Sequence, residues 1–273
     1  MRATRPARLW LCLTLLLGLL AVSPAGWPAA ETLPPAGPAA DALIPPELAA
    51  EEAQLAEQFR QPPIDLGVLD QLAEVRARIA EALARLGETG RAMEYLLASL
   101  DLAPDHLDRW DRLGDLALQS GRVEDRTLAE HAWRQVLTLE PAHHGARIKL
   151  ASLAMARRAY PEAMRHLEVA LAAEGARLEW LQVATLTSLY ALTGQIGQGR
   201  KYFSHMARAT GDDRFVLADA ILLQVSGDGK NAAKRLRDIQ EGSLTPDLLK
   251  RYAASLQAEF TPGLLDGLLK WLK

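Results

Sequence analysis

A spacing of 34 to 37 residues recurs along this chain, and it restricts the fold more than any other feature of the sequence. Large apolar residues return at intervals of 34, 37 and 36 residues, at Ile79, Leu113, Leu150 and Leu186. Small residues return in step, at intervals of 37, 34 and 36 residues, at Ala92, Ala129, Ala163 and Gly199. Repeats of this length are typical of solenoids, in which helical hairpins stack on one another.

Between these positions the sequence has the periodicity of α-helices. Beyond Pro63, apolar residues are spaced three and four apart, and we find no convincing strand-like alternation of apolar and polar residues. The interruptions are brief and centre on glycine or proline, which end helices. The sequence therefore predicts an all-α fold.

One segment carries a family resemblance. Its marker residues are a tryptophan, a Leu-Gly pair, a small residue, a second aromatic residue and a proline, at Trp110, Leu113, Gly114, Ala129, Trp133 and Pro141. In this order they resemble a tetratricopeptide repeat (TPR). The segment departs from the family pattern at Ala117, where tyrosine is preferred, and by about three extra residues between its two helices. Matching units lie at 73–106, 144–177 and 180–213, and a degenerate fifth lies at 214–241.

The resemblance implies a right-handed α-solenoid of about four TPR-like hairpins, with a degenerate fifth and terminal capping helices. In such hairpins a small residue such as Gly114 lets the helices approach closely, and a large residue such as Trp133 fills the space between neighbours. We expect the solenoid to span residues 64–242, after a short leading helix at 46–63. A C-terminal helical cap is expected at 243–273, with docking to a partner or a membrane surface as the alternatives for its apolar face.

The first 30 residues resemble a secretory signal peptide. Three arginines precede the apolar run Leu9 to Val22, and small residues follow it. A Pro- and Ala-rich spacer is predicted at 31–45. Because the run is shorter than the roughly 20 residues of a spanning helix, we expect cleavage after Ala25 or Ala30 and a mature chain in the bacterial periplasm. The alternative is an uncleaved helix that anchors the protein in the inner membrane, facing the periplasm.

Cysteine content and charge exclude several classes of function. Cys12 is the only cysteine and lies in the leader, so the mature chain would have no disulfide, thiol nucleophile or cysteine-bound metal. The net charge is −3 at pH 7, and loss of the leader would remove three arginines and no acid. This balance argues against a nucleic-acid partner.

The chain lacks a recognisable catalytic set. His143 and His144 are adjacent, but they lack further ligands at zinc spacing, and a solvated turn is the favoured interpretation. Gly194, Gly197 and Gly199 are not preceded by the strand of a nucleotide-binding loop, and they fit a turn between helices. We therefore predict a protein that is not an enzyme, with no catalytic, cofactor-binding or metal-binding residues.

The resemblance assigns a binding role to the first helix of each repeat, because in this family these helices line a concave groove. The positions it implies for a peptide-binding groove are Glu74, Glu81, Asp108, Asp111, Asp115, Leu118, Ile148, Ser152, Met155, Leu181, Ala184 and Ser188. The groove is expected to be acidic at its N-terminal end and apolar in the middle.

The aspartates at 108, 111 and 115 share one helical face, and two interpretations of them stay open. Such a face is usually plain solvated surface. However, like charges at this spacing cost roughly a few tenths of a kcal/mol per pair, and only Arg109 and Arg112 are evident as compensation in the sequence. A ligand with basic and apolar side chains would suit this face.

The predicted function is that of a non-enzymatic protein–protein interaction scaffold or adaptor in the cell envelope. A secretion, polysaccharide-export or envelope-assembly complex is the expected setting. Two alternatives stay open: a membrane-anchored assembly factor, and an enzyme or enzyme subunit that uses the groove as a substrate cleft. The expected partner is a protein or peptide with basic and apolar character, and membrane contact through either end of the chain is an open alternative. The sequence does not set the oligomeric state or the pathway.

Overall fold

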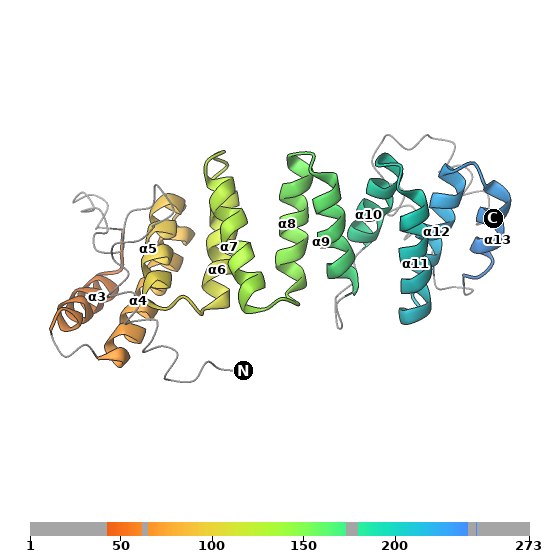
Figure 1. The fold of residues 1–273 in the computed structure, drawn as a ribbon. Coiled ribbons are helices and arrows are strands. Elements are labelled where there is room, and N and C mark those ends of the chain that lie inside the picture. The colour runs from red at the N-terminus through yellow and green to blue at the C-terminus, as the bar shows by residue number, and fades with distance from the viewer. Residues whose placement is uncertain (1–42, 62–64, 173–179, 240–243, 245–273) are drawn as a thin grey trace, which may run out of the picture. The chain divides into compact units, whose positions relative to one another are not determined.

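The structure, a computed structural model, describes residues 43–61, 65–172, 180–239 and 244. Within these residues every regular element is an α-helix (Figure 1). The chain divides into two compact units, Met1–Pro104 and Asp105–Lys273. The predicted signal peptide and, apart from Leu244, the predicted C-terminal cap lie outside the described residues. Among the described helices, none is both long and apolar enough to cross a membrane.

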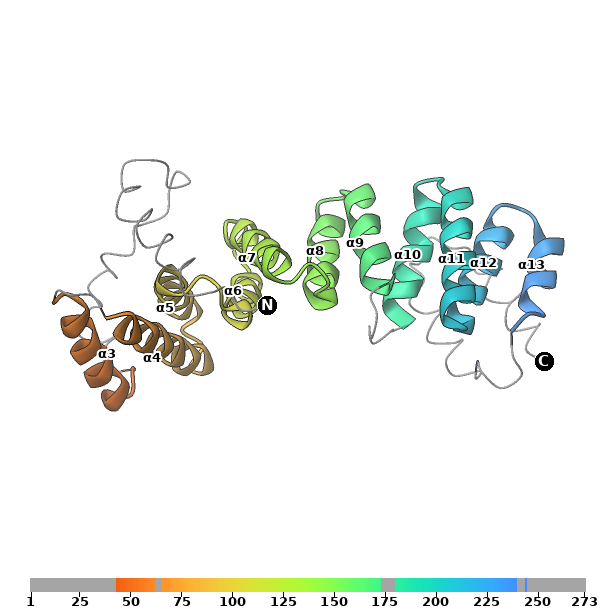
Figure 2. The ribbon, with the colours of Figure 1, turned by 60° about the horizontal axis from the view of Figure 1, so that its bottom comes forward.

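The described part of the first unit is three helices: α3 (Pro46–Phe59), α4 (Leu66–Arg85) and α5 (Thr89–Leu102). The predicted leading helix is α3, which begins at a proline suited to the first helical turn. Figure 2 shows α3 beside α4, and α4 forms a hairpin with α5. Arg76 joins all three helices, because its Nε lies 3.0 Å from Glu52 Oε1 on α3 and its Nη1 donates to the carbonyl of Ala98 on α5.

The second unit consists of successive antiparallel hairpins in its described part. Their helices are α6 (Leu107–Gln119), α7 (Asp125–Leu139), α8 (His144–Ala156), α9 (Tyr160–Ala172), α10 (Trp180–Leu192), α11 (Ile196–Thr210), α12 (Asp213–Val225) and α13 (Gly229–Leu236). The first three hairpins correspond to the predicted repeats from 107 to 213, and α12 and α13 form the predicted degenerate fifth. The predicted fold class, an all-α solenoid of TPR-like hairpins, is confirmed.

The small and large marker residues pack as the repeat pattern predicts. Trp133 on α7 is fully buried, and a Cβ atom added to Gly114 on α6 would overlap its indole ring. A Cβ atom added to Gly199 on α11 would likewise overlap the ring of Tyr190 on α10. Because any side chain at these two glycines would push the helices apart, the glycines allow the two helices of each hairpin to pack closely.

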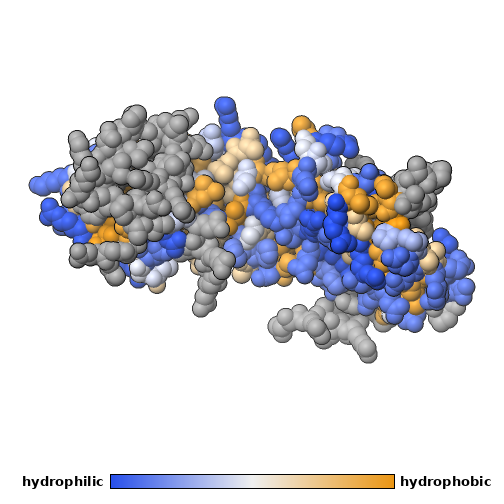
Figure 3. All heavy atoms as spheres, turned by 180° about the vertical axis from the view of Figure 1, so that it is seen from behind, coloured by the Kyte–Doolittle hydropathy of each residue, from blue (hydrophilic) through white to orange (hydrophobic). Residues whose placement is uncertain are grey.

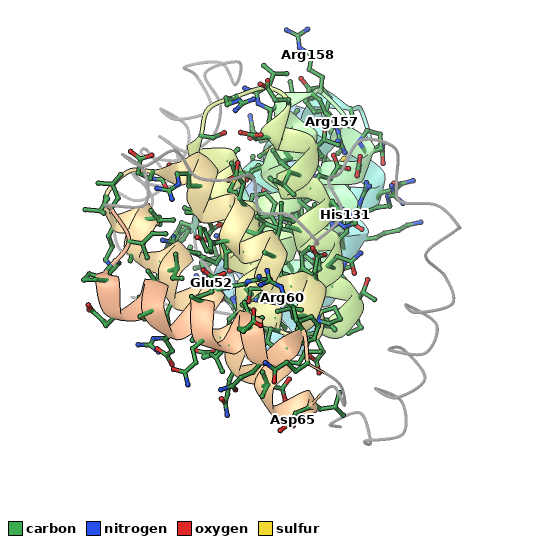
Figure 4. All side chains as sticks on the ribbon, turned by 90° about the vertical axis from the view of Figure 1, so that its left-hand side faces the viewer. Glu52, Arg60, Asp65, His131, Arg157 and Arg158 are labelled. Atoms are coloured by element: carbon green, nitrogen blue, oxygen red, sulfur yellow. The ribbon has the colours of Figure 1, made fainter. Side chains whose placement is uncertain are left out.

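One hairpin turn differs from the others in its backbone. The turns after α6, α10 and α12 each use a glycine with positive φ, whereas the turn after α8 uses Arg158, with φ of 60°. The next residue, Ala159, donates its N–H to the carbonyl of Ala154 at 2.8 Å, which is the Schellman bond that closes a helix end. Figure 4 shows the Arg158 side chain projecting away from the turn.

Candidate protein-binding surface

Lys149 joins the first helices of two successive hairpins, α6 and α8. Its Nζ lies 2.9 Å from both carboxylate oxygens of Asp111 and 2.7 Å from Oδ1 of Asp115. The same ammonium lies 5.5 Å from the ring centroid of Trp133. Two carboxylates and one indole face therefore surround a single cation on the exposed side of the stack.

The electrostatics of this group keep Lys149 charged. Partial burial by itself lowers the pKa of the ammonium, but hydrogen bonds to Asp115 and Asp111 outweigh burial and raise the pKa above its ordinary value. Lys149 and the two aspartates are all partly exposed, so solvent weakens their ion pairs. The arrangement is a surface site that holds a cation while remaining in contact with water.

The expectation that the three aspartates have only Arg109 and Arg112 near them is wrong. Arg109 is buried, and Lys149 supplies the compensation from the next repeat. Lys149 follows Arg112 by 37 residues, which is one repeat. A comparison of charges one repeat apart would have found this pairing, because first helices of successive hairpins lie beside each other.

Around this group, α6 and α8 expose a mixed acidic and apolar set of side chains. Asp108 is exposed one turn before Asp111, and it forms no ion pair with a described side chain. Leu118 at the end of α6 is 45% exposed. We call the set the first-helix surface; its members are Asp108, Asp111, Asp115, Leu118, Ile148, Lys149, Ser152 and Met155.

The other predicted groove residues lie elsewhere. Leu181 lies in the first turn of α10 and is 57% exposed, whereas Ala184 and Ser188 on the same helix are buried in the core. They are buried because α10 packs against α9, α11 and α12 and has no charged residue to present to water. Glu74 and Glu81 lie on α4 in the first unit. Within the described part of the second unit, the predicted residues on α6 and α8 come together.

Apolar side chains do not merge into one large area on the face shown in Figure 3. Hydrophobic residues there form separate patches divided by hydrophilic ones. A surface of this kind suits a partner that combines polar and apolar contacts, since recognition surfaces carry both.

The histidine pair has a local structural role. His143 precedes α8, and its Nδ1 accepts a hydrogen bond from the backbone N–H of Ala146 at 3.1 Å, so the side chain caps the helix. Within the described residues there is no group of three or more His, Cys, Asp or Glu side chains placed to hold a metal ion.

The chain is similar to solved structures, but its sequence matches no family model and no curated protein. Among solved structures, MamA is similar at 15% identity, with 69% of this chain and 96% of MamA covered and a TM-score of 0.46. YrrB, described as a TPR protein with an unusual peptide-binding site, is similar at 12% identity, with 79% and 97% covered and a TM-score of 0.45. PilF of Pseudomonas aeruginosa is similar at 17% identity, with 75% and 93% covered and a TM-score of 0.39.

These identities and scores are low, so the assignment of the fold depends on the residues and hairpins themselves. The glycine–aromatic contacts, the repeat spacing and the successive hairpins define an α-helical repeat protein with a TPR-like fold.

Proposed function

We propose that this protein is a scaffold that binds a protein or peptide segment through the first-helix surface. The segment carries a basic side chain beside apolar ones. The observation that carries this proposal is the Lys149 ammonium, held between Asp111 and Asp115 over the Trp133 ring. The two carboxylates, which are partly exposed, are suited to a lysine or arginine of a ligand, because carboxylates are the usual partners of such cations.

A ligand cation has two places to bind on this surface. It can pair with Asp108, which forms no ion pair with another described side chain, or it can displace Lys149 from Asp111 and Asp115. Leu118 and Met155 supply apolar contact next to the carboxylates. Since exposed ion pairs contribute about 1 kcal/mol or less, affinity requires several such contacts along an extended or helical segment.

The setting we propose is the bacterial envelope, with the protein as an adaptor in a secretion, polysaccharide-export or envelope-assembly complex. Support comes from the signal-like residues 1–30, which lie outside the described residues. Mass spectrometry of the mature N-terminus tests this setting. Cleavage after Ala25 or Ala30 supports the exported form, and a retained leader favours the anchored alternative.

The binding proposal is tested by crosslinking in cells, followed by mass-spectrometric identification of partners. Asp111→Asn with Asp115→Asn should lose the partner, because the cation site loses its charge. Lys149→Met should capture more of it, because the internal competitor is gone while both acids remain.

The crosslinking experiment needs a control variant that changes an acid outside the proposed binding surface. Glu140→Gln removes an exposed acid at the C-cap of α7, outside the first-helix surface, and should leave capture unchanged. Each variant is checked for native helicity by circular dichroism. If Lys149→Met and the double asparagine variant change capture in the same direction, the cation-binding role of the surface is wrong.

A further inference from the structure

A second charged surface lies on α11 and α13, far along the chain from the first-helix surface. Neither helix contains an Asp or Glu. On α11, Lys201, His205 and Arg208 are spaced i, i+4 and i+7, which places them on one helical face. All three side chains are exposed.

The last helix and its C-cap repeat this pattern. Lys230, Lys234 and Arg237 are again spaced i, i+4 and i+7, and all three are exposed. None of the six side chains forms an ion pair with another described side chain. We call these six residues the basic face.

A buried carboxylate holds the two helices of the basic face in place. Asp219 on α12 is 1% exposed. Its Oδ1 accepts from Arg200 Nε on α11 at 2.9 Å, and its Oδ2 accepts from Arg235 Nε on α13 at 2.9 Å. The buried carboxylate thus pairs with Arg200 and Arg235, and the six side chains of the basic face stay available for an external partner.

The opposite charge is concentrated in the first unit. Residues 43–104 contain 11 Asp and Glu against 5 Lys and Arg, whereas residues 196–239 contain 5 against 8. Exposed or partly exposed carboxylates of the first unit include Glu47, Glu88 and Glu94, which form no ion pair with a described side chain. One chain therefore carries an acidic region and a basic region on different units.

We propose that the basic face binds the acidic α3–α5 unit of a second copy of this chain, in a head-to-tail contact. Charge complementarity argues for this occupant, because the α3–α5 unit of a second copy offers the carboxylates that match the basic face. Because the two surfaces differ, the contact is heterologous, and it can extend into chains of molecules.

The first test is sedimentation of the full chain at two ionic strengths. Raising salt from about 0.01 M to about 1 M shortens the Debye length from about 30 Å to about 3 Å. We expect a weight-average mass above the monomer at low salt and the monomer mass at high salt. The proposal is overturned if the chain is a monomer at both salt concentrations, or if the association persists at high salt.

The second test separates the two surfaces. One variant loses the acids, by Glu47→Gln, Glu88→Gln and Glu94→Gln, and the other loses the basic face, by Lys201→Gln, Lys230→Gln, Lys234→Gln and Arg237→Gln. Each variant alone should be a monomer at low salt. An equimolar mixture should form a dimer and nothing larger, because only one complementary pair of surfaces remains in it.

Native helicity of both variants, measured by circular dichroism, is the control for folding. A mixture that stays monomeric rules out the head-to-tail contact. If the natural chain stays monomeric and instead binds phosphatidylglycerol vesicles, with binding lost in the variant without the basic face, the face belongs to a membrane. Neither variant changes the first-helix surface, so the outcome is independent of the proposed function.

Discussion

The two halves of the second unit, α6 to α9 and α10 to α13, use similar hairpins but are held together differently. In the first half, ion pairs at the surface join neighbouring hairpins. Lys149 links α6 to α8, and Arg157 links the end of α8 to Glu130 on α7 and Glu162 on α9. These partners are at least partly exposed.

In the second half the connecting contacts are buried. The Tyr190 and Phe203 rings meet edge to face, with centroids 5.7 Å apart, and Phe203 stacks on Phe215 at 6.2 Å. Asp219 lies inside the same region with two arginines and Ser204. The difference indicates a division of roles: exchangeable surface contacts suit ligand recognition, while buried aromatic and ionic contacts fix the geometry of the C-terminal hairpins.

The largest effect is expected from breaking the buried ion pair. Asp219→Ala should lower the free energy of unfolding by about 3 kcal/mol, because Arg200, Ser204 and Arg235 all lose their hydrogen bonds to this buried carboxylate. This value is the lower end for buried pairs, since the Arg200 side chain is 41% exposed. Asp111→Ala, at the surface pair, should cost less than about 1 kcal/mol. Urea denaturation measures both, and equal losses would contradict the contrast between the halves.

The core of the first half is tested at Gly114. Gly114→Ala should cost about 2 kcal/mol, because the added methyl group overlaps the Trp133 indole and forces the helices apart. Gly197→Ala is the matched control, since its Cβ would meet no atom within 4 Å. Gly197 lies in the first turn of α11, so that change should stabilise by less than the roughly 1 kcal/mol of a helix interior. A neutral Gly114→Ala would mean that the first half relies on its surface ion pairs.

Substitutions in the hairpin turns should change the stability by less, and in opposite directions in the two halves. Arg158→Gly should raise the free energy of unfolding by about 0.5–1 kcal/mol, because glycine adopts positive φ without steric cost. Gly194→Arg, at the equivalent turn of the second half with φ of 71°, should lower it by a similar amount. Thermal unfolding of both variants measures the difference. A loss of stability in Arg158→Gly would show that the arginine makes contacts that outweigh its backbone strain.

The smallest expected effect is a pH dependence located on α9. Burial lowers the pKa of His166 below its ordinary value of 6.5; Glu162 opposes this, and Arg147, Arg165 and Arg134 add to it. The unfolded chain then binds a proton that the folded chain does not. Stability is therefore complete above about pH 6.5 and declines as the pH falls through the folded-state pKa. His166→Gln should flatten this decline, as measured by urea denaturation at a series of pH values, and an unchanged decline would contradict the assignment to His166.

The sequence predicts the hairpins well because their signals are local. Helix periodicity, the proline at the start of α3 and the repeat spacing of apolar and small residues identify the elements, and the Gly114–Trp133 contact follows from the repeat pattern. The surface is predicted less well. Ala184 and Ser188 occupy positions that line a groove in the repeat pattern, yet α10 is enclosed by its neighbours and buries them.

By itself, the sequence determined the all-α class, the TPR-like hairpins and the acidic face of α6, since each depends on spacing along one or two helices. Only the tertiary structure decided what those charges meet. Lys149 reaches Asp111 and Asp115 from the next repeat, and Asp219 gathers Arg200 and Arg235 from two other helices. Such contacts join residues 16 to 38 positions apart, and they form only once stacking has brought separate helices side by side.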